Sequence, residues 1–235
     1  MTVYRKLAAS SVAAIHNALL NRRARLEGEA NDGYAADELD EKDQRFFGEW
    51  EEQLHTEKKE FFEGEIELLG QLIRDVEQLR LDDRKIKLFM EQLIDDILAT
   101  NENEKVLIFT EYRTTQNYLK DALESRFGES SVELINGSMP HQTRREAIAS
   151  FEEDAQFLIS TEAGGEGINL QRKCHIMVNY DLPWNPMRLV QRIGRLYRYG
   201  QHKRVVVFNV HSPDTADEQI IDLMYTSIDQ VVSDM

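Results

Sequence analysis

From residue 105 onward, short runs of apolar residues alternate with helical patterns, and this alternation restricts the fold more than any other feature of the chain. Each run has five to seven residues, the length of a strand that is buried on both faces. Strands that alternate with helices in this way form a parallel sheet covered by helices on both sides. The five predicted strands are 106–110, 132–136, 157–161, 175–180 and 204–210.

The segments between these strands carry the signals that begin and end helices. Gly128 follows a helical pattern directly, and glycine is the residue that most often ends a helix. Pro140 can occupy the first turn of the next helix, because proline lacks the N–H that this turn leaves unused. The predicted helices end near Phe127, Phe151 and Tyr199, the last of these begins at Pro186, and a final helix opens at a capping box of Thr215 and Glu218.

The first hundred residues follow a different pattern. All four prolines lie after residue 139, and the first hundred residues read as helix almost throughout. Apolar residues between Ile86 and Leu98 recur at the spacing of one helix face without a miss. The stretch 27–40 holds two glycines and many acids, and is predicted to be a loop. We therefore expect a helical arm over residues 1–82 and an α/β unit over residues 83–235.

The charge of the chain is unevenly distributed. The formal net charge of −15 argues by itself against nucleic-acid binding. Residues 27–67 contain 16 acidic and 4 basic residues, a net charge of −12. Residues 172–204 hold eight Lys and Arg and one acid, a net charge of +7. The average therefore hides an acidic insert and a basic patch, and the patch is what a phosphate-bearing partner would meet.

Composition also restricts where the chain works. No stretch approaches the ~20 consecutive apolar residues that cross a bilayer, and the N-terminus shows no signal-peptide pattern. The one cysteine, Cys174, excludes internal disulfides and cysteine-rich zinc sites, and the histidines show no metal-ligand spacing. We expect a cytoplasmic protein without a metal site of its own.

The strongest chemical signal is the segment QRIGRLYRYGQ, residues 191–201. Arg192, Arg195 and Arg198 recur every three residues in a predicted helix. Arg195 and Arg198 would then project from one face, where two guanidinium groups can grip a phosphoryl group. The alternative is an ordinary solvated basic face.

Two further segments support this one. STEAGGEGINLQ, residues 160–171, follows a strand directly, and its three glycines allow tight turns and close approach to a ligand. A purely structural turn is the alternative. YDLPWNP, residues 180–186, sets Trp184 between two prolines beside the basic patch. Trp184 either stacks on a base or sugar or packs on its own domain.

In this order and spacing, the segments resemble the second RecA-like lobe of superfamily-two helicases and translocases, in the Swi/Snf-type DNA-dependent ATPase family. KVLIFTEY (105–112) is similar to motif four, 160–171 to motif five and 191–201 to motif six. The element Asp-x-x-Trp-Asn-Pro at 181–186 is typical of the Swi/Snf branch. The resemblance covers about residues 83–225. The N-terminal helices are similar to those of bacterial members related to the polymerase-recycling ATPase.

The resemblance implies roles for nine residues. Arg195 and Arg198 match the arginines that reach the γ-phosphate of ATP across the cleft between two lobes. Glu166 departs from the family, in which many members have an apolar residue, and we assign it no role. The positions expected near the nucleotide are Gln191, Gly167 and Asn169. The positions expected to contact nucleic acid are Thr110, Thr161, Trp184 and Arg188.

A motor of this family needs a first lobe with a glycine–lysine phosphate loop and acids for Mg²⁺. This chain has no such loop, and we read the acidic run 37–40 as a coincidence. The sequence is therefore expected to be half of a motor. Its expected partners are the first lobe of the same polypeptide, ATP with Mg²⁺, and double-stranded DNA. The helical arm is a further candidate surface for a protein partner.

Two other functions stay open at this stage. One is an unwinding helicase of the same superfamily that acts on RNA or DNA. The other is a non-catalytic interaction module that docks through its acidic helical arm. The sequence favours a double-stranded DNA translocase, because the Asp-x-x-Trp-Asn-Pro element and the final Arg-x-Gly-Gln are typical of that branch.

Overall fold

The computed structural model describes residues 2–28, 60–162, 164–165, 167–183 and 185–211. Most of the predicted loop and acidic insert lies outside these residues. So do Glu166, Trp184 and the capping box of Thr215 and Glu218. No helix among the described residues is long and apolar enough to span a lipid bilayer.

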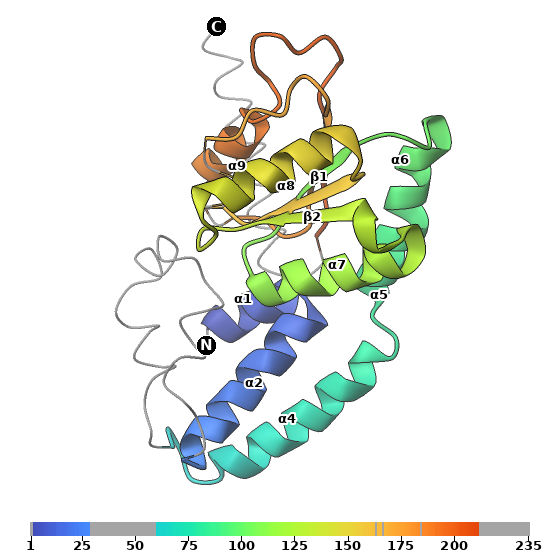
Figure 1. The fold of residues 1–235 in the computed structure, drawn as a ribbon. Coiled ribbons are helices and arrows are strands. Elements are labelled where there is room, and N and C mark those ends of the chain that lie inside the picture. The colour runs from blue at the N-terminus through green and yellow to red at the C-terminus, as the bar shows by residue number, and fades with distance from the viewer. Residues whose placement is uncertain (1, 29–59, 163, 166, 184, 212–235) are drawn as a thin grey trace, which may run out of the picture.

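Five parallel strands form one sheet in the order β2-β3-β1-β4-β5 (Figure 1). This confirms the predicted parallel sheet, with each strand slightly shorter than the apolar run that predicted it. In the register of the sheet, Phe109 lies beside both Ser160 and Asn179, so the last residues of the three central strands are level. The strands are β1 (Val106–Phe109), β2 (Val132–Ile135), β3 (Phe157–Ser160), β4 (Ile176–Asn179) and β5 (Val206–Asn209).

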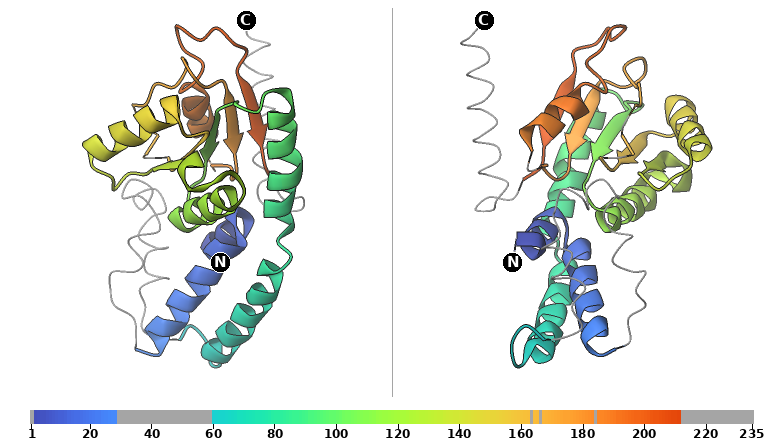
Figure 2. Two further views of the ribbon diagram at one scale, coloured as in Figure 1. Left: turned by 45° about the vertical axis from the view of Figure 1, so that its right-hand side comes forward. Right: turned by 90° about the vertical axis from the view of Figure 1, so that its left-hand side faces the viewer.

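Helices cover both faces of the sheet, as the alternation of strands and helices predicted. In Figure 2 (left), the strands lie between α8 on one side and α6 on the other. Alternate strand residues point to opposite faces, so each face has its own apolar cluster. The helices of this part are α5 (Arg84–Leu88), η1 (Phe89–Ile94), α6 (Asp95–Thr100), α7 (Arg113–Phe127), η2 (Glu129–Ser131), α8 (His141–Glu153) and α9 (Pro186–Ile193).

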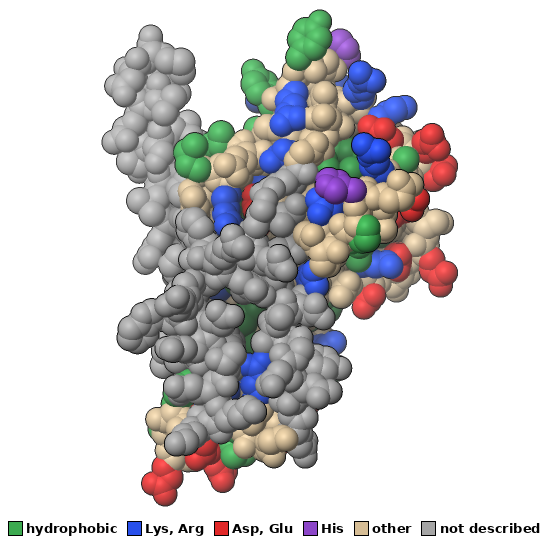
Figure 3. All heavy atoms as spheres, turned by 60° about the vertical axis from the view of Figure 1, so that its left-hand side comes forward, with side chains coloured by type: hydrophobic (Ala, Val, Ile, Leu, Met, Phe, Trp, Pro, Cys, Tyr) green, Lys and Arg blue, Asp and Glu red, His purple; other side chains and the backbone are tan. Residues whose placement is uncertain are grey.

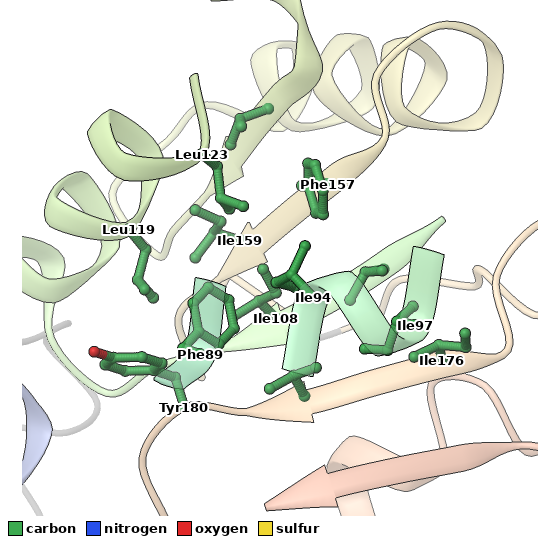
Figure 4. Packing of buried hydrophobic residues seen from close by; sticks show 13 residues of the cluster. Phe89, Ile94, Ile97, Ile108, Leu119, Leu123, Phe157, Ile159, Ile176 and Tyr180 are labelled. Carbon is green, nitrogen blue, oxygen red and sulfur yellow. The ribbon is translucent and has the colours of Figure 1, made fainter. Parts of the chain in front are cut away.

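The first cluster joins η1, α6 and α7 to one face of the sheet (Figure 4). η1 is a π-helical turn between the α-helical turns of α5 and α6. Phe89 and Ile94 are five residues apart, and both are buried to 1% exposure or less. A π turn brings residues five apart onto one face, which accounts for this burial. The sequence predicted a helix here but not its wider turn.

Over residues 2–28 and 60–82, the part of the arm that the structure describes, three helices lie outside the sheet: α1 (Thr2–Ser10), α2 (Val12–Leu26) and α4 (Glu65–Arg80). α2 and α4 lie side by side, as Figures 1 and 2 both show. Leu19 from α2 packs against Leu69, Ile73 and Val76 from α4 in a cluster separate from those of the sheet. Below, the sheet and its covering helices are called the lobe.

The predicted helix from Pro186 to Tyr199 is wrong at its C-terminal end, because α9 stops at Ile193. Gly194 follows, and Arg195 and Leu196 donate from their backbone N–H groups to carbonyls only three residues back. The side chain of Leu196 is fully buried, which draws this segment inward. Arg195 and Arg198 therefore lie in turns after the helix rather than on one helix face.

Candidate functional site

The carboxyl ends of β1 and β4 lie side by side where the order of the strands in the sheet reverses. The connection that leaves β1 leads to one side of the sheet, and the one that leaves β4 leads to the other. Ligands of open α/β sheets bind at such a point. Here the carboxylate of Asp181 bridges the two strands, since it accepts from Thr110 Oγ1 at 2.6 Å and from the Glu111 N–H at 2.8 Å.

The helical arm reaches the same carboxylate. Ser10 Oγ, at the end of α1, donates to Asp181 Oδ2 at 2.6 Å and lies 2.8 Å from Thr115 Oγ1. Lys85 Nζ donates to the carbonyls of Ala9 and Ser10 at 2.6 and 3.0 Å. The junction of α1 and α2 is thus bonded directly to the strand ends of the lobe, although it lies about a hundred residues away in the sequence.

The three glycines of the 160–171 loop are needed for different reasons. A Cβ at Gly164 would lie 2.5 Å from the carbonyl oxygen of Ile135, and one at Gly165 would lie 2.8 Å from the ring of Phe109. At these two positions the protein's own packing, not a ligand, leaves no space for a side chain. Gly167 differs, because its φ of +76° is unfavourable for other residues and open space surrounds it. Only Gly167 is available for close approach to a ligand.

The residues predicted to bind nucleotide come from two segments that the fold brings together. The Arg198 guanidinium donates to Asn169 Oδ1, and the Leu170 N–H donates to the Arg195 carbonyl at 3.5 Å. Arg198, Asn169, Gly167 and Gln191 have exposed side chains or backbone, and Arg195 is half-buried. The turns after α9 therefore run alongside the glycine loop, as the predicted site requires.

The predicted nucleic-acid contacts are less accessible. Thr110 is fully buried, and its hydroxyl is committed to Asp181. Thr161 is 1% exposed, and its hydroxyl accepts from the Gly164 N–H at 3.3 Å. The structure does not support a phosphate contact by either hydroxyl, because strand-end packing closes both. Arg188 is partly exposed, with Nη1 4.0 Å from Glu111 Oε1, and Trp184 lies outside the described residues.

The basic stretch 172–204 is spread along the sheet rather than gathered in one place. Arg172 and Lys173 precede β4, and Lys203 and Arg204 precede β5, so these four lie toward the amino ends of the strands. Arg188 and Arg192 follow β4 and lie toward its carboxyl end. Figure 3 shows Lys and Arg side chains spread over the upper part of the molecule. Three of the basic groups also face carboxylates of the lobe: Arg192 with Glu162, Lys203 with Glu104 and Arg188 with Glu111.

Several polar residues at the strand ends had no role assigned to them from the sequence. A signal was available, since each of Glu162, Asn179 and Asp181 ends or follows an apolar run, and parallel strands end at the same edge. Ser10 carried no such signal, because it comes from the distant arm. No group of three or more His, Cys, Asp or Glu in the described residues is placed to hold a metal ion.

Comparison with known proteins agrees with this geometry. Residues 85–200 match the family described as "Helicase conserved C-terminal domain". The uncharacterized ATP-dependent helicase YqhH of Bacillus subtilis is 47% identical over 58% of this chain and 24% of its own length. The RNA polymerase-associated protein RapA of Pectobacterium atrosepticum is 37% identical over 56% of this chain and 14% of its own.

A solved structure and further relatives agree. The C-terminal part of the Fun30 ATPase domain superposes with a TM-score of 0.52 and 28% identity, over 57% of this chain and 43% of that one. Relatives also include Swi/Snf-related chromatin regulators of mouse and human. The chain spans about a quarter or less of the length of these curated relatives. Residues 85–200 are therefore a helicase C-terminal domain with a RecA-like fold, whose homologues are Swi/Snf-type superfamily-two ATP-dependent helicases.

Proposed function

We propose that residues 83–235 are the second motor lobe of an ATP-dependent translocase or remodeller of double-stranded DNA. Residues 1–82 then form the helical arm that joins this lobe to the first one in the same polypeptide. The observation that carries the proposal is the contact of Arg198 with Asn169, because it brings the arginine turns and the glycine loop into one exposed site. The greater length of the relatives supports a longer motor protein.

In this proposal Arg195 and Arg198 stabilise the charge that develops on the γ-phosphoryl group when the two lobes close. Arginine suits the task because its planar fork can hold two oxygens of one phosphoryl group. The Asn169 amide and Gln191 offer further donors, and the backbone at Gly167 can approach a phosphate closely. These donors fit phosphate oxygens. ATP and its Mg²⁺ would be held chiefly by the first lobe, since motors of this family carry the phosphate loop and the acids for Mg²⁺ in that lobe.

The DNA track would run over the exposed basic residues after the glycine loop, with Trp184 and Arg188 as contacts. Ion pairs inside the lobe leave less charge for DNA than the sequence count of +7 suggests. We therefore expect weak duplex binding by this chain, with an affinity that falls steeply as salt rises. Deletion of residues 29–59 should leave this binding unchanged or strengthen it, because that acidic segment repels phosphates.

The test compares this chain with a protein that carries both lobes. The 235-residue chain alone should not hydrolyse ATP, whereas the two-lobed protein should hydrolyse it faster when duplex DNA is added. Steady hydrolysis by the isolated chain would contradict the half-motor proposal.

A strand-separation assay with the two-lobed protein distinguishes the remaining alternatives. A translocase should consume ATP on duplex DNA without releasing single strands. Release of strands would indicate an unwinding helicase instead. Absence of any ATP hydrolysis, with the chain still folded, would favour a non-catalytic interaction module.

A further inference from the structure

The three arginines that the sequence spaces evenly have different environments. Arg198 is exposed and Arg195 is half-buried, but Arg192 is only 1% exposed. An arginine stays charged at any physiological pH, and a buried charge is tolerated only when it is paired and hydrogen-bonded. Arg192 therefore cannot be a third arginine for the nucleotide, and its partners indicate a different task.

Arg192 divides its hydrogen bonds between the ends of β3 and β4, the two strands that flank β1. Its Nε donates to Glu162 Oε2 at 2.8 Å, just beyond the end of β3. Its Nη1 donates to Asn179 Oδ1 at 3.0 Å and to the Asp181 carbonyl at 3.1 Å, at the end of β4. The guanidinium also lies 5.0 Å from the centre of the Phe109 ring, at the end of β1. One side chain thus ties α9 to three adjacent strand ends.

α9 needs directional contacts of this kind to hold it in place on the lobe. It has only eight residues, too few for a helix that is stable by itself. Met187 and Val190 on this helix are 61% and 60% exposed, so its apolar contact with the lobe is narrow. Leu189 and Leu196 anchor the segment in the core, but apolar packing is not directional. Charged hydrogen bonds are directional, and they can set the rotation of the helix about its axis and its position relative to the strand ends.

We propose that Arg192 is a positioning residue, which together with Glu162 fixes α9 against the strand ends and so fixes where Arg195 and Arg198 lie. Arg195 and Arg198 follow Arg192 by three and six residues, so a shift of α9 moves both. The catalytic consequence rests on the proposed function. The structural consequence does not, and it can be measured in this chain alone.

The first experiment measures amide hydrogen exchange in the 235-residue chain. Arg192→Gln and Glu162→Gln should speed exchange in residues 186–198 by about tenfold or more, with little change in α7 or α8. The double variant should recover part of the protection that Arg192→Gln loses, because it removes the carboxylate left unpaired. Unchanged exchange over 186–198 in Glu162→Gln, the milder variant, would overturn the proposal.

The matched control is the other buried arginine–glutamate pair. Arg22 and Glu65 join α2 to α4 at 2.8 Å, far from the arginine turns. Glu65→Gln should speed exchange in α2 and α4 but not in residues 186–198. If this control speeds exchange over 186–198 as much as Glu162→Gln does, the effect is general loss of stability and the proposal fails.

The second experiment measures steady-state ATP hydrolysis by the two-lobed protein. Arg192→Gln should lower kcat by about a hundredfold, the scale on which a misplaced catalytic group acts, with KM for ATP little changed. Glu65→Gln should leave kcat unchanged. A normal kcat in Arg192→Gln would overturn the catalytic part of the proposal. If the unaltered protein hydrolyses no ATP, the proposed function fails, and hydrogen exchange still decides whether the pair positions α9.

Discussion

Among the described residues, the arm and the lobe each contain one arginine that is almost fully buried, and the two are used differently. In the arm, Arg22 gives both Nε and Nη2 to the two oxygens of Glu65, at 2.8 and 3.0 Å. In the lobe, Arg192 donates from Nε and Nη1 to three different acceptors. The arm pair is bidentate and joins two helices. The lobe arginine connects several segments at the edge where the proposed site lies.

We expect the bidentate pair in the arm to serve stability, and the divided contacts of Arg192 to fix geometry as well. Glu65 lies in the first turn of α4, where the helix dipole favours a carboxylate. The ring of Phe61 also lies 4.3 Å from the Arg22 guanidinium. These contacts of Arg22 with Glu65 and Phe61 lie within the arm. Loss of this pair should weaken the arm without altering the site, and the predictions below test that separation.

The largest expected effect is on catalysis. In the two-lobed protein, Arg195→Ala and Arg198→Ala should each lower kcat by ~10³-fold or more, since arginines at a transferring phosphoryl group contribute on that scale. ATP affinity and duplex affinity should change little, and the free energy of unfolding should change by less than about 0.5 kcal/mol, because neither side chain is deeply buried. Steady-state kinetics, binding titrations and urea unfolding measure these quantities. If a variant kept normal turnover but lost DNA binding, the arginine that it replaces would be a DNA contact rather than a catalytic residue.

The next effect is on stability alone. Glu65→Ala should lower the free energy of unfolding by about 3–5 kcal/mol, because it leaves the buried Arg22 charge without its carboxylate. Urea unfolding followed by circular dichroism measures the change. At a temperature where the variant is still folded, kcat in the two-lobed protein should stay normal. A fall in kcat comparable to that of Arg192→Gln would break the separation between arm and lobe.

A smaller effect is expected where the two regions meet. Ser10→Ala removes the hydroxyl that donates to Asp181 and should cost about 1.5 kcal/mol, the scale of a hydrogen bond to a charged group. Asp181 keeps its bonds from Thr110 and the Glu111 N–H, which limits the loss. Exchange of the Glu111 amide should nevertheless speed up. Ser11→Ala is the matched control, because the Ser11 hydroxyl caps α2 at the Ala14 N–H and lies against Thr115 Oγ1 rather than Asp181. Equal exchange at Glu111 in both variants would mean that Ser10 does not couple the arm to the strand ends.

The smallest effect is on pH dependence, and it should differ between the regions. In the lobe, burial lowers the pKa of His175 from its ordinary 6.5 and outweighs the attraction of Glu104, whose Oε1 lies 3.1 Å away. The unfolded chain then binds more protons near and below pH 6.5, so stability should fall by less than about 1 kcal/mol as pH drops from 7.5 to 5.5. His175→Gln should flatten this slope in urea unfolding at several pH values.

In the arm the titration comes at lower pH. Burial alone would raise the pKa of Glu65, but its hydrogen bonds from Arg22 and from the Phe61 N–H outweigh this, so the pKa lies below the ordinary 4.5. The stability from this depressed pKa is complete above pH 4.5 and is lost as pH falls toward the folded value. Glu65→Gln should therefore leave the slope between pH 7.5 and 5.5 unchanged. A change of that slope would place the titrating group in the arm.

Much of the fold could be read from local patterns. All five strands were predicted within about two residues at each end, because a strand buried on both faces must be a short apolar run. The end of α7 at Phe127 was predicted as well, since Gly128 follows it directly. The order of the strands in the sheet was not predicted, because no local pattern records which strands lie side by side.

The glycine loop shows where local reading stops. Its position after a strand was correct, and so was the need for glycine. On sequence alone, the glycines were explained by tight turns and close approach to a ligand. At Gly164 and Gly165 the reason is instead that a Cβ would collide with Ile135 and Phe109, which are at least 29 residues away in the chain. A sequence shows that a side chain is missing, but only the folded chain shows what occupies the space.

The sequence by itself determined the parallel α/β fold, the positions of its motifs and the family to which they are similar, because these depend on short-range spacing. Spacing by itself did not separate Arg192 from Arg195 and Arg198, which share a residue type and an even spacing, and only the family resemblance assigned roles to the last two. The tertiary structure separates them. α9 ends at Ile193 and Leu196 turns into the core, so the regular helix face that would have aligned the three does not exist. Arg192 instead faces the ends of β1, β3 and β4. Its burial among their polar groups gives it a role that the spacing of the arginines does not show.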